Sequence, residues 1–97
     1  MIVGRIVRTT QSREDALDIW AYVARDNPRA ATKLLRLFDE TLRRLAESPG
    51  IGAAQDKYRA GLRSFPIGNY VLFYEAIAEG IRVIRILHAA RNWPDLL

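Results

Sequence analysis

The alternation of apolar and polar residues is clearest over residues 61–91, where it predicts three short strands joined by two turns. The segment is rich in Ile, Val, Leu, Phe and Tyr, which suit a pleated and half-buried surface. Gly68-Asn69 and Glu79-Gly80 contain residues that readily adopt the positive φ angles of hairpin turns, so we expect the turns there. Pro66 predicts that the first of the three strands is short or bulged.

The third of these strands has two mixed faces. Because side chains alternate along a strand, one face is expected to present Arg82, Ile84, Ile86 and His88, and the other Ile81, Val83, Arg85 and Leu87. Each face then holds apolar residues and a cation, whereas a strand that only covers a core keeps its charges on one side. We therefore expect a basic groove or a partner on the second face of the sheet.

The N-terminal part is predicted to form a strand over residues 2–8, with Ile2 and Ile6 facing inward, and then a helix over about residues 12–25. Ser12 is a favourable helix cap, and Asp15 is placed to reach back to it as in a capping box. The apolar residues of this helix recur at helical spacing. They are Ala16, Trp20, Val23 and Ala24, with Leu17 and Ile19 widening the stripe.

A second helix is predicted to begin at Asn27, a good cap, and Pro28, a good first helical residue. It should continue to about residue 47, where Ser48-Pro49-Gly50 ends it. Its apolar stripe consists of Ala31, Leu34, Leu35, Phe38, Leu42 and Leu45. Two helices with so short a link must be antiparallel neighbours, and their apolar stripes must pack on the sheet.

The order of these elements, β-α-α-β-β-β, predicts an α+β fold in which an antiparallel helical hairpin packs on a mainly antiparallel four-stranded sheet. The first strand is expected to pair within the sheet formed by the last three. Residues 1–97 suit a single domain. Residues 50–60 are expected to form a loop, and Trp93, Leu96 and Leu97 in the tail either dock on the core or await a partner.

Composition narrows the class of protein. The formal net charge is +4, and of the fifteen basic residues two are lysines, Lys33 and Lys57, so thirteen are arginines. This excess suits an acidic partner, protein or nucleic acid, although a GC-rich genome would also favour arginine. Without cysteine, an apolar run of membrane-spanning length or a signal peptide, the sequence predicts a cytoplasmic protein with no disulfide framework.

One set of polar residues is a candidate for chemistry: Arg63, Tyr74, Arg85, His88 and Arg91. If the three strands form a meander, Arg63, Arg85 and Tyr74 converge. A His or Tyr would then transfer protons while arginines stabilise charge on a scissile phosphate, as in RNA cleavage. With His88 as the single histidine, the sequence predicts no metal site, and no cofactor is implied.

A purely structural interpretation of the same residues is also open. Arg85 would pair with a helix carboxylate such as Asp18 or Glu14, and His88 would be a satisfied structural histidine. Tyr70 and Tyr74, two tyrosines at strand spacing, are more typical of a core than of catalysis. Trp20 and Phe38 are assigned to the core.

Several segments together resemble one protein family. The runs Leu62-Arg63-Ser64-Phe65, Gly68-Asn69-Tyr70-Val71, Phe73-Tyr74 and Arg85-Ile86-Leu87-His88-Ala89-Ala90-Arg91 closely resemble the C-terminal half of ParE toxins, in the RelE/ParE superfamily of type II toxin–antitoxin modules. Residues 16–31 and 45–52 are similar to the helical hairpin of this family and its end. The resemblance covers nearly the whole chain and implies the fold predicted above.

The superfamily has two activities. RelE-like members cut messenger RNA on the ribosome, with basic residues on the sheet and a Tyr or His near the C-terminus, whereas ParE-like members poison DNA gyrase. This sequence departs from the RelE pattern, because it has no lysine after Lys57 and ends in Trp93-Pro94-Asp95-Leu96-Leu97. The resemblance therefore implies a gyrase poison that acts by binding and has no catalytic residue. The alternative is a ribosome-dependent endoribonuclease that uses Arg63, Arg85 and His88, and a third possibility is a toxin fold that no longer poisons.

The resemblance also implies a ParD-like antitoxin that forms a hetero-oligomer with this protein. Such antitoxins bind through an acidic amphipathic C-terminal segment that folds on contact. The candidate contacts are the apolar residues along the helical hairpin together with Arg8, Arg36, Arg63, Arg82 and Arg85. The candidates for contact with the target are His88, Arg91 and Trp93.

Overall fold

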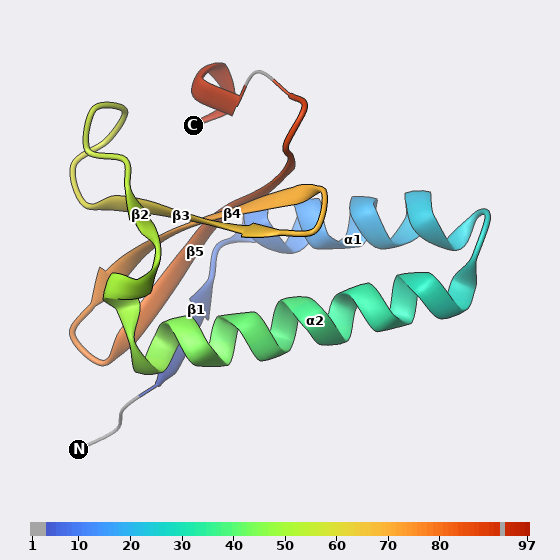
Figure 1. Cartoon of the computed structure of the whole chain (residues 1–97), viewed down its shortest axis with the longest axis horizontal. Helices are drawn as coiled ribbons and strands as arrows, with labels where there is room; N and C mark the ends of the chain where they lie inside the picture. Colours follow the sequence, from blue (N-terminus) through green and yellow to red (C-terminus); the bar gives the residue numbers. More distant parts are fainter. Residues whose placement is uncertain (1–3, 92) are drawn as a thin grey trace.

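The computed structural model describes residues 4–91 and 93–97. Two antiparallel helices pack beside a twisted sheet, and the C-terminal residues lie on the opposite side of that sheet (Figure 1). The elements are β1 (Arg5–Arg8), α1 (Thr10–Ala24), α2 (Pro28–Glu47), the 3-10 turn η1 (Pro49–Ile51), β2 (Ala53–Ala54), β3 (Leu62–Ile67), β4 (Tyr70–Ile77), β5 (Gly80–His88) and the 3-10 turn η2 (Trp93–Leu96).

The sheet has the strand order β1-β5-β4-β3-β2, with β1 parallel to β5 and every other pair antiparallel. The α+β class and the mainly antiparallel sheet are thus confirmed, but the predicted number of four strands is wrong. The fifth strand, β2, lies in the expected loop and pairs with Arg63 and Ser64 of β3. Two alanines have no alternating pattern, so the sequence offered no signal for this strand.

The first strand pairs within the sheet as predicted, and Ile6 packs against the main core. The predicted inward position of Ile2 lies outside the described residues. Pro66 does not shorten β3, which continues to Ile67. Beyond Ser64 the outer edge of β3 is not paired with β2, so a residue without a backbone N–H costs nothing there.

The start of α1 differs from the prediction. Thr9 is the cap, and its side chain accepts a hydrogen bond of 3.1 Å from the backbone N–H of Ser12. Ser12 is therefore inside the helix and buried, and the predicted capping box of Ser12 and Asp15 is wrong. The Thr9 hydroxyl also donates to the carbonyl oxygens of Val83 and Ile84, at 2.9 and 3.2 Å. Contacts with β5, rather than the local sequence, thus decide where α1 begins.

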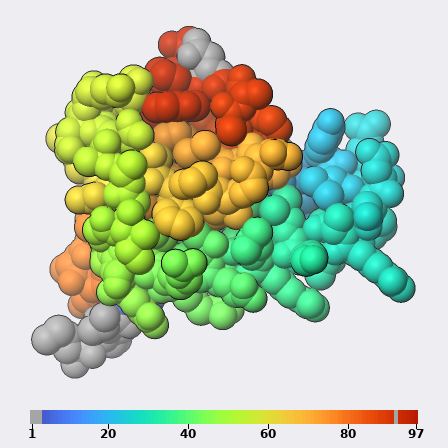
Figure 2. Space-filling view, viewed as in Figure 1, coloured from blue at the N-terminus to red at the C-terminus, as the bar shows by residue number. Residues whose placement is uncertain are grey.

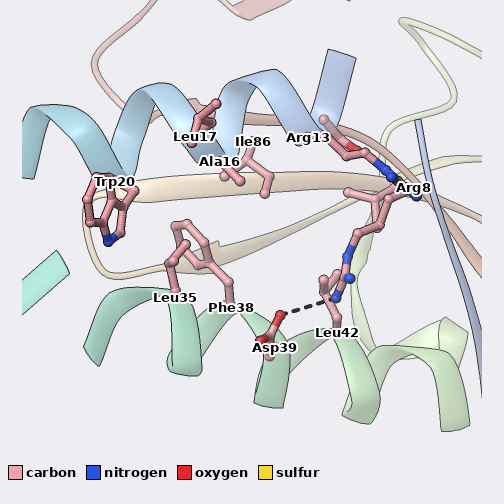
Figure 3. Close-up of a pocket in the computed structure, with 12 residues that line it drawn as sticks. Arg8, Arg13, Ala16, Leu17, Trp20, Leu35, Phe38, Asp39, Leu42 and Ile86 are labelled. Atoms are coloured by element: carbon pink, nitrogen blue, oxygen red, sulfur yellow. Dashed lines mark hydrogen bonds and ion pairs between the residues drawn. The ribbon is translucent and has the colours of Figure 1, made fainter. Parts of the chain in front are cut away.

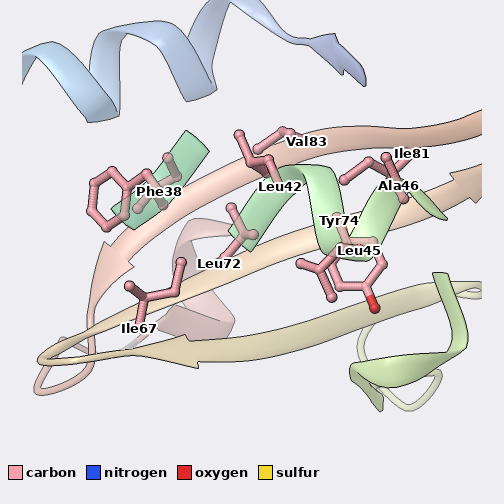
Figure 4. Close-up of a cluster of buried hydrophobic side chains, with 10 residues drawn as sticks. Phe38, Leu42, Leu45, Ala46, Ile67, Leu72, Tyr74, Ile81 and Val83 are labelled. Atoms are coloured by element: carbon pink, nitrogen blue, oxygen red, sulfur yellow. The ribbon is translucent and has the colours of Figure 1, made fainter. Parts of the chain in front are cut away.

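The second helix begins and ends as predicted. The Asn27 side chain accepts from the backbone N–H of Ala30 at 3.0 Å, and Pro28 is the first helical residue. Figure 4 shows how side chains of α2 meet those of β3, β4 and β5 in the main core. The buried members of this core are Phe38, Leu42, Leu45, Ala46, Ile67, Leu72, Tyr74, Ile81, Val83 and Ile86.

Two of the turn glycines have different roles. Gly68 has a φ of +56°, as a hairpin turn requires, which confirms the predicted turn at Gly68-Asn69. Gly80 does not have a positive φ; it lies at the start of β5, where a Cβ atom would overlap the backbone of Arg5 in β1. The reason for glycine at position 80 is therefore the close approach of the parallel strand.

A β-bulge changes the faces of β5. Phe73 is opposite Arg85 and Tyr74 is opposite Val83, so Ile84 is the extra residue. Ile86 consequently packs with Ile81 and Val83 on the helix side, and the predicted division into two strictly alternating faces is wrong beyond the bulge.

The second face of the sheet is covered by the end of the chain itself, and not open as a basic groove. A smaller cluster of buried residues there, Leu62, Phe73 and Leu87, is in contact with Trp93, Leu96 and Leu97. The Trp93 ring lies 5.0 Å from that of Phe73 and 4.8 Å from that of Tyr58. Of the two possibilities left open for the tail, docking on the core is the one observed.

Candidate functional site

Helix α1 forms a ridge between two grooves. The first groove lies between α1 and α2, has a volume of about 490 Å³, and is lined mostly by apolar side chains (Figure 3). Residues of β5 form its floor, and the two helices form its walls. Those used below are Leu17 and Trp20 of α1, Leu35, Phe38 and Leu42 of α2, and Val83 and Ile86 of β5.

The α1 wall of this groove exposes large apolar side chains. Leu17 is 65% exposed and Trp20 is 37% exposed, so the assignment of Trp20 to the core is wrong, whereas that of Phe38 is confirmed. The cause is the rotation of α1 about its axis, because the helix turns Ser12 and Asp15 toward the sheet. The apolar residues on its flank are left to line the groove.

Cations lie at one end of the first groove. The Arg8 guanidinium extends from β1 and pairs with Asp39 of α2 at 3.1 Å (Figure 3). Arg13 of α1 lies near it and is exposed. Within residues 4–91 and 93–97, no carboxylate is within salt-bridge distance of Arg13, so its charge is available to an acidic ligand.

A nearly buried ion pair holds α1 against β5. Arg85 donates from Nε to Oδ2 of Asp15 at 2.8 Å and from Nη2 to Oδ1 at 3.0 Å. The backbone N–H of Ile86 donates to the same carboxylate at 3.0 Å. The hydrogen bond with Asp15 raises the pKa of Arg85. Arg85 thus pairs with a helix carboxylate as the structural interpretation predicted, but the partner is Asp15 and neither Asp18 nor Glu14.

The second groove lies on the other flank of α1, where the β3–β4 turn and the end of β5 meet it. Its volume is about 690 Å³, and Asp18, Tyr22, Tyr70, His88 and Arg91 are among its lining residues. The rings of Tyr70 and His88 are 5.4 Å apart at 78°. Burial, and to a lesser extent the neighbouring Tyr22, raise the pKa of Tyr70. The groove thus combines aromatic rings with a cation.

The comparisons with known proteins agree on one family. Residues 6–93 match the family described as "ParE toxin of type II toxin-antitoxin system, parDE". The chain belongs to this family. It is 32% identical to Toxin ParE1 of Caulobacter vibrioides over 83 residues, which is 84% of this chain and 85% of the relative. It is 41% identical to Toxin ParE1 of Mycobacterium tuberculosis over 59 residues, 60% of each chain.

The fold comparison agrees with this membership. A chain of the structure titled "Chromosomal ParDE TA system from P. aeruginosa" superposes with a TM-score of 0.72 at 19% identity. The superposition covers 89% of this chain and 96% of the other. At that identity the match establishes the shared fold, and the resemblance predicted from the strand segments is confirmed by the family match.

The predicted antitoxin contacts of this ParE-family chain are spread over several elements. Arg8 lines the first groove, and Arg36 lies on the outer surface of α2. Arg63 donates to the carbonyl of Gly52 at 2.7 Å, and Arg82 pairs with Glu75 at 2.7 Å. Arg85 is engaged by Asp15. Only Arg8 of the five predicted arginines lines the first groove.

The residues of the alternative catalytic set do not meet at one point. Arg63 of β3 is opposite Tyr74 of β4, which in turn is opposite Val83 of β5. Val83 is five residues from His88, or about 16 Å along β5. Tyr74 is buried; its hydroxyl donates to the Pro49 carbonyl at 2.6 Å and accepts from the Gly52 N–H at 2.8 Å. Burial raises the pKa of Tyr74. These polar groups hold η1 and β2 against the sheet.

The three predicted target contacts are divided. His88 and Arg91 line the second groove, whereas Trp93 packs on the far face of the sheet. The His88 Nδ1 atom accepts a hydrogen bond of 3.1 Å from the backbone N–H of Ala90, so a neutral ring carries its proton on Nε2. His88 and Arg91 are both exposed and available to a ligand.

Sequence reasoning missed two residues of the candidate site, Arg13 and Tyr22. The sequence did contain a sign that both flanks of α1 are exposed. Leu17 and Trp20 lie on one side of the helix and Tyr22 on the other, which is more apolar surface than a single packed face needs. In the described part of the chain, no three His, Cys, Asp or Glu side chains gather as a metal site would require. No helix found there is both long and apolar enough to span a membrane.

Proposed function

We propose that this ParE-family protein is a toxin that inhibits DNA gyrase in the cytoplasm and is neutralised by a ParD-like antitoxin, with which it forms a hetero-oligomer. The single observation that supports the antitoxin part is the open apolar groove between α1 and α2. Leu17 and Trp20 are exposed and line this groove in a chain of 97 residues. Apolar side chains gathered in an open groove are typical of a surface that another protein covers.

The groove suits an acidic amphipathic helix. Its apolar walls would receive the apolar side chains of such a segment, which recur every three or four residues. Arg8 and Arg13 at one end would meet carboxylates, and this charge pairing sets the direction of the bound segment. A segment without stable structure of its own would fold as it enters the groove.

The groove is tested with purified protein and the product of the neighbouring gene, by calorimetry. Leu17→Ala and Trp20→Ala should each weaken binding by tenfold or more, since both remove apolar contact area. Tyr22→Ala is the matched control: Tyr22 is 71% exposed on the same helix but faces the second groove. If removing the antitoxin's C-terminal segment leaves its affinity unchanged, the proposed binding mode is wrong.

The target is tested separately, by gyrase supercoiling and DNA-cleavage assays. We expect protein-linked, cleaved DNA that disappears when the antitoxin is added. His88→Ala and Arg91→Ala should weaken this effect if the second groove contacts the target. No effect of the wild-type protein on gyrase would contradict the proposal, and cut messenger RNA in a translation extract would favour the endoribonuclease alternative.

A further inference from the structure

The outer face of α2 carries a stripe of cations, one of which, Arg36, is a predicted antitoxin contact that lies outside the first groove. The buried face of this helix packs on the sheet, and the opposite face points to solvent. That face presents five cations and two carboxylates, all of them exposed. The cations, called here the basic stripe, are Arg29, Lys33, Arg36, Arg43 and Arg44, and the carboxylates are Glu40 and Glu47.

In the described part of the chain, no cation of the stripe has an ionic partner, whereas half of the ten lysines and arginines outside the stripe have one. Arg5, Arg8, Arg59, Arg82 and Arg85 each lie within 4.0 Å of a carboxylate. Among the residues whose positions are described, no carboxylate is that close to any member of the stripe. Five cations and two carboxylates leave a charge of +3 on one helix face, out of +4 for the whole chain.

The first half of the stripe borders a hollow in the surface. A shallow depression of about 500 Å³ is lined by Pro28, Arg29, Thr32, Lys33 and Arg36. Side chains of this teal-to-green part of the chain project into solvent on the lower right of Figure 2. None of the lining residues is aromatic, and Pro28 is the one apolar residue among them. The depression thus offers positive charge with almost no apolar contact.

We propose that the basic stripe binds the phosphate backbone of double-stranded DNA. Arg29 and Arg36 are seven residues apart in the helix, with Lys33 between them, which corresponds to about 10 Å along its axis. Over that length one DNA strand presents about three charges. An acidic amphipathic protein segment would need a row of apolar anchors, whereas Leu37 is the one large apolar side chain exposed among the described residues of α2. A single strand would need aromatic rings on which its bases stack, and the lining has none.

Binding of this kind depends on charge and not on base sequence, since side chains that contact phosphates read no base edges. It is independent of the first groove, which lies on the side of α2 that faces α1. A DNA-bound stripe and an occupied groove are therefore compatible. Failure of the stripe would leave the antitoxin and gyrase proposals untouched, because their assays use other residues.

The first test measures anisotropy of a labelled 20-base-pair duplex of arbitrary sequence between 50 and 200 mM salt. The variant R29Q/K33Q/R36Q should bind at least tenfold more weakly, and the slope of log K against log salt should fall by roughly 2 to 3, about 0.9 per lost contact. The matched control R5Q/R59Q/R82Q removes the same number of charges from arginines that have carboxylate partners. It should keep more than half of the wild-type affinity.

Three outcomes would overturn the proposal. They are no binding of the duplex by the wild-type protein at 50 mM salt, an equal loss in the control variant, and competition by polyglutamate as effective as that by unlabelled duplex. Equal binding of a single strand would also contradict the duplex assignment. Circular dichroism of each variant checks that its fold is retained. Glutamine is a good helix former, so the substitutions suit an exposed helix face.

A second test needs no variant. The chain has two lysines, Lys33 in the stripe and Lys57 in the loop before β3, and both are exposed. With duplex DNA bound, acetylation of Lys33, followed by mass spectrometry, should slow at least threefold while that of Lys57 is unchanged. Equal protection of both lysines, or protection of Lys57 alone, would place the DNA elsewhere and overturn the proposal.

Discussion

The guanidinium of Arg85 and the carboxylate of Asp15 face each other with two parallel hydrogen bonds, although 70 residues separate them in the chain. The remaining Nη1 group of Arg85 donates to the carbonyl of Leu96 at 2.8 Å. One arginine therefore links α1, β5 and the C-terminal turn, and the orientation of α1 between its two grooves depends on it. This pair explains why a charged residue is tolerated in the middle of β5.

Removing one partner of this pair should be costly. Asp15→Ala leaves Arg85 and the N–H of Ile86 without their acceptor, and we expect the free energy of unfolding to fall by about 3 kcal/mol. Asp18→Ala, three residues away on the exposed surface, should change it by less than about 0.5 kcal/mol. Urea unfolding measures both, and equal losses would show that the pair has no special role.

The Tyr74 hydroxyl is a second buried link. Tyr74→Phe removes the acceptor of the Gly52 N–H and the donor to the Pro49 carbonyl, so it should destabilise the protein by about 2 kcal/mol. Hydrogen exchange should accelerate at the Gly52 amide, whose one described partner is this hydroxyl. Unchanged exchange there would mean that η1 and β2 are held by other contacts.

The same residue predicts the direction of a pH effect. Burial raises the pKa of Tyr74 above its ordinary value of 10.0, so near that pH the unfolded chain loses the phenol proton more readily than the folded one. The contribution of this group is complete below pH 10 and is lost as the pH rises through the folded-state pKa. Urea unfolding at pH 8 and pH 11 should show a smaller loss of stability in Tyr74→Phe than in wild type, and identical losses would contradict this assignment.

Glycine at position 80 is predicted to be required by packing. An added methyl group would overlap the backbone of Arg5, so Gly80→Ala should displace β1 and reduce the free energy of unfolding by about 2 kcal/mol or more. Gly50→Ala is the control, because nothing lies within 4 Å of a Cβ atom at that position. Thermal unfolding of both variants decides the matter; a stable Gly80→Ala protein would mean that β1 adjusts without cost.

Local sequence signals were sufficient for the elements whose stabilising contacts are close in the chain. Asn27 and Pro28 determine the start of α2, and the Asn27 side chain contacts a residue only three positions further along the chain. The apolar stripe of α2 indicates the length of the helix and the face that is buried. Gly68 determines the β3–β4 turn through its own backbone conformation. The residue pattern of β3 to β5 also carried enough of the family's features to predict the family.

What the sequence alone did not determine are the features that depend on partners distant in the chain. Thr9 caps α1 while also bonding Val83, 74 residues away, and this contact decides the start of the helix over the better local candidate Ser12. The same docking turns Asp15 inward and leaves Trp20 at the groove. The pattern of the sequence thus determined most of the elements. The tertiary structure decided the rotation of α1, because backbone groups of β5 and the Arg85 side chain hydrogen-bond to Thr9 and Asp15.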